Sequence, residues 1–355
     1  MHTPPSLSSL YLYLSDRCNL RCGHCWISPA FSTEAQSGVP LPRLKKIIRE
    51  ARDLGLASVK LTGGEPFLYQ EIRALLEFLA AAGLTVYIET NGSLLDASLV
   101  RHLEKCGPGL ISVSLDGASP AVHESIRGVG GCFEATRKGL QLLAEAGLPV
   151  QVIMTLQRKN REEIPDLIAL CEEMGAESLK INHLLPCGRA RQRFEQRENL
   201  PLEELIALYN EVDQRWARRS NLTILFDLPV AFRSPSDLTH RGINECRIFN
   251  ILSVLANGDY SICGIGQCAE ELRLGSVYTD SLERLWTDHP ILKDLRAALP
   301  AQLEPPCRDC IFRYQCLGSC RANAYVVSGS LQAAYFLCTE YHASGRFPGS
   351  RIVEP

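Results

Sequence analysis

The fold is decided by Ser9-Leu-Tyr-Leu-Tyr-Leu-Ser15, which continues through Asp16 and Arg17 into Cys18-Asn-Leu-Arg-Cys22-Gly-His-Cys25. The first part predicts a β-strand, and the three cysteines therefore lie on the loop that follows it. Three thiolates with the spacing C-x3-C-x2-C can hold three irons of a 4Fe–4S cubane and leave the fourth iron without a protein ligand. A zinc site that includes His24 is the alternative for so close a spacing.

Beyond these cysteines, helical and strand-like stretches alternate. The strands are short and rich in Val, Ile and Leu, which is typical of parallel strands covered by helices, and Gly55, Gly83 and Gly147 stand where helices should end. We predict helices over 41–54, 70–82, 95–105, 132–146 and 161–174, each followed by a strand, over 58–61, 85–89, 110–115, 149–155 and 178–181. The predicted fold class is α/β, a partial (β/α)6 TIM-like barrel whose active site forms at the C-terminal ends of the strands.

The cysteine content is the abnormal part of the composition. The chain has 15 cysteines in 355 residues, an odd number that cannot be fully paired as disulfides, so metal binding is the better interpretation. Seven of the eight that lie toward the C-terminus suit nearly two sets of four cluster ligands, with a pair of structural zinc sites as the alternative. These seven are Cys246, Cys263, Cys307, Cys310, Cys316, Cys320 and Cys338.

The chain divides into four predicted parts. Residues 1–227 form the barrel, and the Pro- and Gly-containing residues 228–244 form a linker. Residues 245–338 have short elements and lack a sizeable apolar core, so we expect a small domain that metal holds together. Residues 339–355 form a C-terminal tail, which we expect to be an arm or partly disordered.

Charge and hydropathy exclude several classes of partner. The formal net charge of −3 gives no reason to expect a nucleic-acid partner. No apolar run approaches the roughly 20 residues that a membrane span needs, and the first residues lack the features of a signal peptide. We therefore expect a cytoplasmic protein without a membrane partner.

Polar motifs follow the next three strands. Thr62-Gly63-Gly64-Glu65-Pro66 follows the second strand, where adjacent glycines let the backbone approach a ligand and a carboxylate can accept from an ammonium group. Asn91 follows the third strand, and Ser114 and Asp116 follow the fourth. Such short polar side chains can bind hydroxyl and carboxylate groups of a ligand, with ordinary turn formation as the alternative.

The cysteine loop and the Gly-Gly-Glu-Pro motif together resemble those of the radical S-adenosylmethionine (radical SAM) superfamily, over residues 9 to about 190. The resemblance implies that Cys18, Cys22 and Cys25 hold a 4Fe–4S cluster whose open iron binds S-adenosyl-L-methionine (AdoMet). It implies an enzyme that cleaves AdoMet reductively to a 5′-deoxyadenosyl radical, which abstracts hydrogen from a substrate. The residues implied to bind AdoMet are Gly63, Gly64, Glu65, Pro66, Asn91, Ser114 and Asp116.

The C-terminal cysteines resemble the SPASM domain, a module of peptide-maturing radical SAM enzymes, over residues 246–338. The resemblance implies two auxiliary iron–sulfur clusters. One would be held by Cys307, Cys310, Cys316 and Cys338. The other would be held by Cys246, Cys263 and Cys320, with Cys268 as the candidate fourth ligand; without Cys268 that cluster has an open iron.

The remaining cysteines differ in interest. Cys106, Cys132 and Cys171 fall within or beside predicted helices, and we interpret them as buried apolar residues. Cys187 lies in Pro186-Cys-Gly-Arg-Ala190, after the sixth strand. A thiol at a strand end can donate a hydrogen atom to a substrate radical, so Cys187 is a candidate catalytic residue, with a passive role as the alternative.

The resemblance favours an oxidoreductase or maturase that acts on a ribosomally made peptide by crosslinking, thioether formation, epimerisation or decarboxylation. Expected partners are a precursor peptide, a flavodoxin or ferredoxin-type reductant and a separate peptide-recognition protein, since no winged-helix recognition domain precedes Cys18. The alternatives are modification of a tetrapyrrole side chain in a haem pathway, a non-enzymatic iron–sulfur or zinc scaffold, and an anaerobic sulfatase-type maturase. The last is disfavoured because Gly264 stands where those relatives place a catalytic carboxylate.

Overall fold

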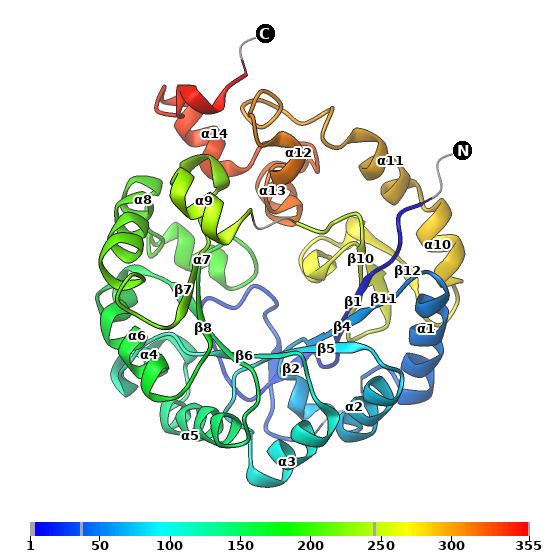
Figure 1. Cartoon of the computed structure of the whole chain (residues 1–355). Helices are drawn as coiled ribbons and strands as arrows, with labels where there is room; N and C mark the ends of the chain where they lie inside the picture. The colour runs from blue at the N-terminus through cyan, green and yellow to red at the C-terminus, as the bar shows by residue number, and fades with distance from the viewer. Residues whose placement is uncertain (1–3, 36–37, 244–245, 354–355) are drawn as a thin grey trace.

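A ring of strands surrounded by helices forms the body of the protein (Figure 1). The computed structural model describes residues 4–35, 38–243 and 246–353. Within these residues the main sheet contains the strands β1 (Ser9–Tyr13), β4 (Ser58–Thr62), β5 (Thr85–Thr90), β6 (Leu110–Ser114), β7 (Val150–Leu156), β8 (Ser178–His183), β9 (Thr223–Phe226), β10 (Ile251–Val254), β11 (Asp259–Ser261) and β12 (Arg273–Ser276). Their order is β12-β11-β10-β1-β4-β5-β6-β7-β8-β9, and the strands from β10 to β9 are parallel. The predicted α/β fold with a partial TIM-like barrel is confirmed.

Helices cover the outer side of this sheet (Figure 1). Gly55, Gly83 and Gly147 have the left-handed backbone that helix ends favour, as predicted. The sequence analysis did not predict α4 (Pro120–Arg127) or α7 (Ala190–Glu195), although Ser119 caps α4 by accepting from the Val122 N–H. The helices of the barrel are α1 (Leu41–Asp53), α2 (Ile72–Ala81), α3 (Ala97–Cys106), α4, α5 (Cys132–Glu145), α6 (Ile164–Glu173), α7 and α8 (Leu202–Glu211).

The two faces of the barrel strands differ in polarity. Successive side chains of a strand point to opposite faces, and one set, which includes Leu10, Val59 and Ile88, is buried against the helices. The alternate set from β1 to β8 is mostly polar, with Leu110 and Ile153 as its apolar members. Its polar members are Ser9, Tyr11, Tyr13, Ser58, Lys60, Thr62, Thr85, Tyr87, Glu89, Ser112, Ser114, Gln151, Thr155, Ser178, Lys180 and Asn182. We call this the inner face. Ordinary TIM barrels fill their interior with branched apolar side chains, so this one has an interior suited to polar ligands.

The C-terminal region is more closely joined to the barrel than the sequence predicts. Strand β10 pairs in parallel with β1, so that Ser9 is opposite Ile251, and β11 and β12 extend the sheet as antiparallel strands. The fully buried Leu252 and Trp286 belong to the same apolar core as the barrel residues. The expectation that this region lacks a sizeable core is therefore wrong. Its helices are α10 (Leu282–Asp288), α11 (Pro290–Ala298), α12 (Arg313–Cys316), α13 (Arg321–Ser328) and α14 (Phe336–Ala343).

The expected linker and tail are ordered and packed. The linker contains α9 (Pro235–Arg241), whose buried Asp237 pairs with Arg233 at 2.6 Å. In the tail, Phe347 packs edge-on against Phe232. Residue 244 of the linker, residue 245 of the region after it and residues 354–355 of the tail lie outside the described residues, and the boundaries between the four predicted parts remain predictions. No helix in the described part of the chain is long and apolar enough to cross a membrane.

Candidate active site

The cysteine loop is docked on the C-terminal end of a neighbouring helix. Short strands β2 (Arg17–Cys18) and β3 (Ala30–Phe31) pair within the loop. The Arg21 N–H donates to the Arg127 carbonyl of α4 at 2.9 Å. Gly128 ends α4 in the left-handed conformation, and a β-carbon there would lie 2.8 Å from the Arg21 carbonyl oxygen. The loop therefore keeps its place through backbone contacts that only glycine at position 128 permits.

The loop cysteines receive hydrogen bonds from the surrounding protein. Cys18 Sγ accepts from the Leu20 N–H at 3.4 Å and from the Asn91 amide at 3.8 Å. Cys22 Sγ accepts from the Arg127 guanidinium at 3.7 Å. Burial raises the pKa of Cys18 to about 12, and a bound metal would deprotonate such a thiol. Because donors aimed at cysteine sulfurs are typical of iron–sulfur sites, these residues fit a cluster held by Cys18, Cys22 and the half-buried Cys25.

The zinc alternative gains no support from the geometry. Within the described residues, no three His, Cys, Asp or Glu side chains are placed to hold one metal ion. A zinc site draws its ligands to one point, whereas a cubane spreads them over separate irons. His24, the proposed zinc ligand, instead lies 3.6 Å from Asp116, and burial lowers its pKa to about 4.

Asp116 is linked to the cysteine loop through Arg127. It is fully buried, and its Oδ2 lies 2.8 Å from Arg127 Nε, while the Thr155 N–H donates to Oδ1. Burial alone would raise the pKa of Asp116, but the Arg127 charge holds it below its usual value. Asp116 thus acts through Arg127 on Cys22, rather than lining an open pocket. The sequence analysis assigned no role to Arg127, although Ser119 and Gly128 could have predicted a helix that ends at this residue.

Glu65 of the Gly-Gly-Glu-Pro motif is also fully buried. Its Oε1 accepts from the Thr90 hydroxyl at 2.7 Å and its Oε2 from the Asn91 N–H at 2.9 Å. Burial raises the pKa of Glu65 to about 7, although these hydrogen bonds act in the opposite direction. The carboxylate therefore clamps the ends of β4 and β5 together. Its predicted contact with the amino group of AdoMet remains a prediction.

The two glycines before Glu65 are needed for the approach of the cysteine loop. The Gly64 N–H donates to the Ser15 carbonyl at 2.8 Å, and a β-carbon on Gly64 would collide with the Arg17 carbonyl. Pro66 follows as the buried start of a short 3-10 turn. These contacts place the ends of β1 and β4 side by side. Ser114 ends β6, half-buried and without a hydrogen bond inside the described part of the chain, so its hydroxyl remains available to a ligand.

We call Cys307, Cys310, Cys316 and Cys338 the four-cysteine group. All four line one small cavity with apolar residues of the linker and the tail. The Ser319 N–H donates to Cys316 Sγ at 3.2 Å. Burial raises the pKa of Cys316 to about 12. Four thiols around one cavity match the ligand set of a fully coordinated 4Fe–4S cluster, as the SPASM resemblance implies.

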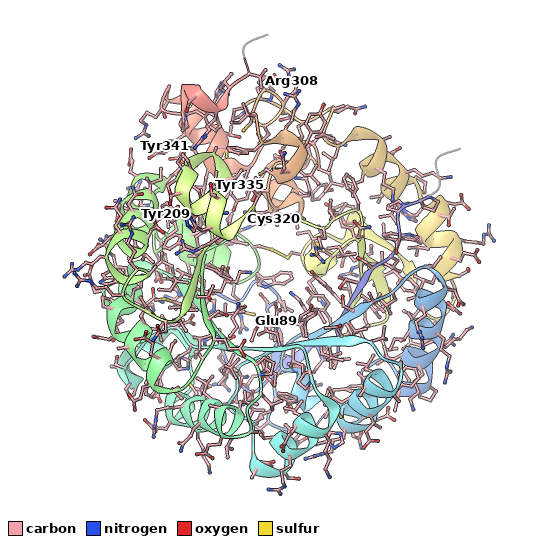
Figure 2. The ribbon with its side chains drawn as sticks, in the orientation of Figure 1. Glu89, Tyr209, Arg308, Cys320, Tyr335 and Tyr341 are labelled. Atoms are coloured by element: carbon pink, nitrogen blue, oxygen red, sulfur yellow. A yellow bond between two sulfur atoms is a disulfide. The ribbon has the colours of Figure 1, made fainter. Side chains whose placement is uncertain are left out.

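We call Cys246, Cys263 and Cys320 the three-cysteine group. Burial raises the pKa of Cys263, and the nearby Cys320 and Cys246 raise it further. These effects indicate that the three sulfurs are near one another. Cys263 also raises the pKa of Tyr11 and of Tyr13, two residues on the inner face of β1. The group therefore faces the barrel interior. Figure 2 shows Cys320 and Glu89 pointing toward the middle of the ring. A cluster held by these thiols would border the space enclosed by the inner face.

Arg321 lies between the two cysteine groups and was missed in the sequence. It is fully buried and donates to the Leu331, Ala333 and Gly318 carbonyls. Its charge acts on cysteines of both groups. Thiolate-bound clusters carry negative charge, so a buried arginine between them is an electrostatic partner for both. An arginine directly after a cysteine was the only signal in the sequence.

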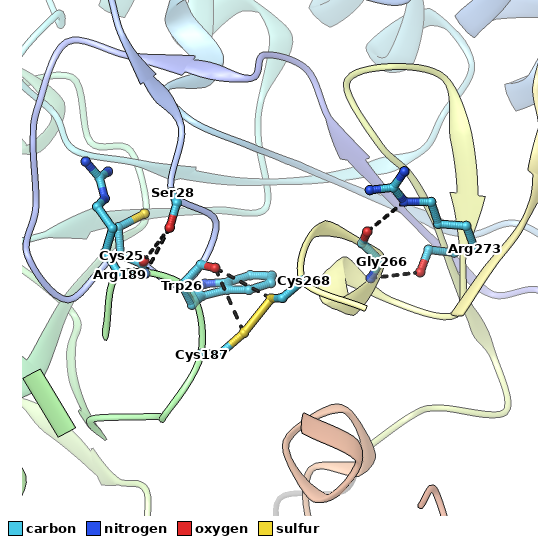
Figure 3. The surroundings of a disulfide bond; sticks show 9 residues. Cys25, Trp26, Ser28, Cys187, Arg189, Gly266, Cys268 and Arg273 are labelled. Carbon is cyan, nitrogen blue, oxygen red and sulfur yellow. Dashed lines mark hydrogen bonds between the residues drawn. A yellow bond between two sulfur atoms is a disulfide. The ribbon is translucent and has the colours of Figure 1, made fainter. Parts of the chain in front are cut away.

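Cys187 and Cys268 form a disulfide in the structure. This differs from the expectation that Cys268 completes the three-cysteine group, because a sulfur bonded to another sulfur is not a thiolate ligand. Figure 3 shows the bond beside Trp26, whose carbonyl oxygen lies 4.0 Å from Cys187 Sγ and 3.6 Å from Cys268 Sγ. The loop after β8 is fastened here, since the Arg189 N–H donates to the Cys25 carbonyl at 3.0 Å. Cys187 thus lies next to the cysteine loop.

The inner face carries a set of charges. Lys60 Nζ lies 2.8 Å from Glu89 Oε1, and the Thr62 hydroxyl donates to Glu89 Oε2 at 3.2 Å. The side chains of Lys60 and Glu89 remain 26% and 38% exposed, so this pair is open to a ligand. At the far end of the sheet, His183, the last residue of β8, pairs with Asp227, which follows β9, at 3.2 Å. The sequence analysis did not identify Lys60 and Glu89, although strict alternation within the predicted strands 58–61 and 85–89 was a usable signal.

Two family profiles match the chain. The radical SAM superfamily profile matches residues 12–171, and the SPASM iron–sulfur cluster-binding domain profile matches residues 246–311. The first match contains the cysteine loop and the Gly-Gly-Glu-Pro motif, and the second contains four of the seven SPASM-like cysteines. The cofactors that these families imply are a 4Fe–4S cluster, AdoMet and auxiliary iron–sulfur clusters.

Characterised proteins resemble the chain along most of its length. An AdoMet-dependent heme synthase from Methanosarcina barkeri is 27% identical over 327 residues, which are 89% of this chain and 91% of that protein. A PqqA peptide cyclase from Xanthomonas axonopodis pv. citri is 26% identical over 330 residues, which are 92% of this chain and 86% of that protein. These relatives act on different substrates, so they do not fix the substrate of this protein.

The fold matches that of a solved enzyme. The crystal structure of Streptococcus suis SuiB, bound to the precursor peptide SuiA, aligns with a TM-score of 0.75 at 22% sequence identity, covering 94% of this chain and 76% of SuiB. This likeness establishes the common architecture of barrel and C-terminal region. Together with the two family profiles and the arrangement of the cysteines, it leads to one conclusion. The chain is a radical SAM enzyme that carries a C-terminal SPASM domain.

Proposed function

We propose that the enzyme modifies a ribosomally made peptide, after abstraction of a hydrogen atom from one of its residues. The main support is the inner face, where hydroxyl, amide and charged side chains replace the apolar side chains of an ordinary barrel. A peptide offers polar groups along its whole length, which such a surface can pair, and polar groups left unpaired in a closed site are costly. The reaction class is crosslinking, thioether formation, epimerisation or decarboxylation.

Residues of the chain divide the work. When bound at Cys18, Cys22 and Cys25, the cluster and AdoMet supply a 5′-deoxyadenosyl radical. Arg127 and Asn91 donate to the cysteine sulfurs and thereby keep the loop in one geometry. The inner face receives the substrate beside this loop, at the strand ends where barrel enzymes place their active sites.

Cys187 remains our candidate hydrogen donor. It lies beside Trp26 of the cysteine loop, in the loop that follows β8. A donor needs an S–H bond, so this role requires the reduced form of the Cys187–Cys268 pair. Product in which the abstracted hydrogen has been replaced by one from solvent would support the role.

The proposed partners follow from the reaction. PqqA peptide cyclase, a relative of similar length, acts on a peptide by its name, and the present enzyme would likewise take a precursor peptide. A flavodoxin or ferredoxin-type protein would supply the electron. A separate recognition protein would hold the precursor.

Mass spectrometry tests the peptide proposal. The enzyme is co-expressed anaerobically with each small open reading frame beside its gene, and each peptide is compared with that made alongside Cys22→Ala. A mass change that requires Cys22 is the expected result. If every such peptide keeps its mass while the purified enzyme still cleaves AdoMet, the peptide proposal is wrong.

A tetrapyrrole substrate is the second candidate. It is favoured by the AdoMet-dependent heme synthase that matches 89% of this chain. Iron coproporphyrin III added to anaerobic enzyme should then bind stoichiometrically and lose carbon dioxide in an AdoMet-dependent reaction. Absence of a spectral change on titration removes this candidate.

The sulfatase-type alternative is further weakened by the structure. A side chain at Gly264 would collide with the Tyr13 hydroxyl and the Trp26 ring. The site therefore has no room for a carboxylate at this position, so the base that sulfatase-maturing relatives place after their second SPASM cysteine is missing here.

A further inference from the structure

One charge on the inner face has no partner. Glu89 is paired with Lys60 and Asp227 with His183, as described above. The side-chain ammonium of Lys180, in the middle of β8, by contrast makes no hydrogen bond or ion pair with any described residue. Its half-buried side chain is on the same face of the sheet as Glu89, by strand alternation and register.

Lys180 lies between the two paired carboxylates. Burial alone would raise the pKa of Glu89 and that of Asp227. Lys60 lowers the first and His183 the second, so that both pKa values are below their usual range, and the Lys180 charge lowers both further. The Lys180 ammonium is therefore close enough to lower the pKa of both carboxylates, but it forms an ion pair with neither. With the Lys60–Glu89 and His183–Asp227 pairs formed, the Lys180 ammonium is left without an ion-pair partner among the described residues.

The register places Lys180 near the expected AdoMet site. Lys180 is opposite Ile153 of β7, and Ile153 is opposite Ser114 of β6. Two strand spacings amount to about 10 Å, a distance that a lysine side chain and one substrate group can span. A ligand group bound by Lys180 would hold a neighbouring atom of the substrate next to the residues that end β6.

We infer that Lys180 binds a carboxylate of the substrate and so orients the substrate toward AdoMet. The inference rests on the proposed function only in that the substrate enters the barrel interior. The carboxylate has two possible sources: an acidic side chain or C-terminus of a peptide, or a propionate of a tetrapyrrole. A lysine ammonium without a partner is a point charge suited to either.

The test measures the preference for a carboxylate with two matched pairs of probes. The reconstituted, AdoMet-bound enzyme is titrated with an N-acetylated Gly-Gly-Asp-Gly-Gly amide and its Asn counterpart. It is also titrated with iron coproporphyrin III and its tetramethyl ester. The same titrations are made on Lys180→Met, on Lys180→Arg and on Lys293→Met, a change at an exposed ion pair on α11.

Wild type should bind the carboxylate member of one pair about tenfold more tightly than its neutral counterpart, the size of a hydrogen bond to a charged group. Lys180→Met should remove this preference, while Lys180→Arg and Lys293→Met keep it. The pair that shows the preference identifies the source of the carboxylate. A wild type without preference in either pair overturns the inference, as does a preference that survives in Lys180→Met.

Measuring AdoMet binding distinguishes a Lys180 that binds the substrate from a Lys180 that binds AdoMet. If Lys180 held the carboxylate of AdoMet itself, Lys180→Met would weaken AdoMet binding and abolish its cleavage without substrate. We expect both to be unchanged, and the opposite result overturns the inference. A peptide that is never modified would refute the proposed function alone, since a carboxylate preference seen with coproporphyrin would remain.

Discussion

The cysteine loop and the four-cysteine group reach the same kind of site in different ways. The loop is held by contacts with protein side chains, among them Arg127, which donates to Cys22 and pairs with Asp116. The four-cysteine group surrounds a cavity, and its chain between Cys316 and Cys320 runs through three consecutive residues with left-handed backbone. The comparison teaches that protein contacts organise the first site, whereas the second depends on what fills its cavity.

Metal removal should give the largest effect and should act on one region only. Structural metal can contribute on the order of 10 kcal/mol to small metal-dependent domains. We expect hydrogen exchange to rise throughout residues 307–338 after anaerobic chelation, while α2 and α3 keep their protection. The measurement is exchange mass spectrometry of the holo and chelated enzyme. Equal loss of protection in both regions would show that the comparison is mistaken.

Arg127→Gln should give the next largest effect. It leaves the buried Asp116 without its charge partner, which costs roughly 3–5 kcal/mol. Urea denaturation should show this loss, and Asp116→Asn combined with Arg127→Gln should recover part of it. Arg137→Gln, which breaks the exposed pair with Glu134, is the control and should cost less than about 1 kcal/mol. An equal effect of the two single changes would contradict the role of Arg127.

Glu65 should make the stability of the barrel depend on pH. Its pKa is about 7 in the folded protein against 4.5 ordinarily, so between these values the folded state binds more protons than the unfolded state. Stability should therefore fall as pH rises through this window, by at most about 3 kcal/mol from this residue. Glu65→Gln should flatten the profile between pH 4.5 and 7. An unchanged slope of unfolding free energy against pH would show that Glu65 is ionised throughout.

With the Cys187–Cys268 pair reduced, as the donor role requires, Cys187→Ser should have the smallest effect on stability and a selective effect on the reaction. Formation of 5′-deoxyadenosine should stay within about twofold of wild type, because this thiol donates nothing to the sulfurs of the cysteine loop. Return of a solvent hydrogen to the substrate, followed by deuterium incorporation, should stop. Cys106→Ser, at the end of α3, should retain both activities. Deuterium incorporation that persists in Cys187→Ser would exclude the donor role.

Much of the barrel was predictable from local pattern. Strands 85–89 and 110–115 were placed within a residue of their ends, because short apolar runs between helices and glycine caps leave few other interpretations. Strand β10 was missed because its pairing with β1 joins residues 251 and 9, a contact that no local pattern encodes. The same reason hid the contact between the C-terminal tail and the linker.

The part of the candidate site that could be predicted is the set of cysteines whose spacing along the chain is typical of cluster ligands. The cysteines of the loop could be grouped from sequence alone, since their ligand spacing is local. The pairing of Asp116 with Arg127 could not, because it depends on the end of α4, a helix that the sequence analysis missed. Lys180 could not be recognised from the sequence for a different reason: alternation shows that its side chain shares a face with Ser178 and Asn182, but not that this face is the inner one.

The central claim is that Cys18, Cys22 and Cys25 hold a cubane with an open iron that binds AdoMet. It is tested most directly by measuring iron content and 5′-deoxyadenosine formation in the same anaerobically reconstituted sample. We predict iron and sulfide without zinc, and 5′-deoxyadenosine on reduction, with Cys22→Ala forming none. Zinc in place of iron, or AdoMet cleavage at the normal rate in Cys22→Ala, would contradict the account.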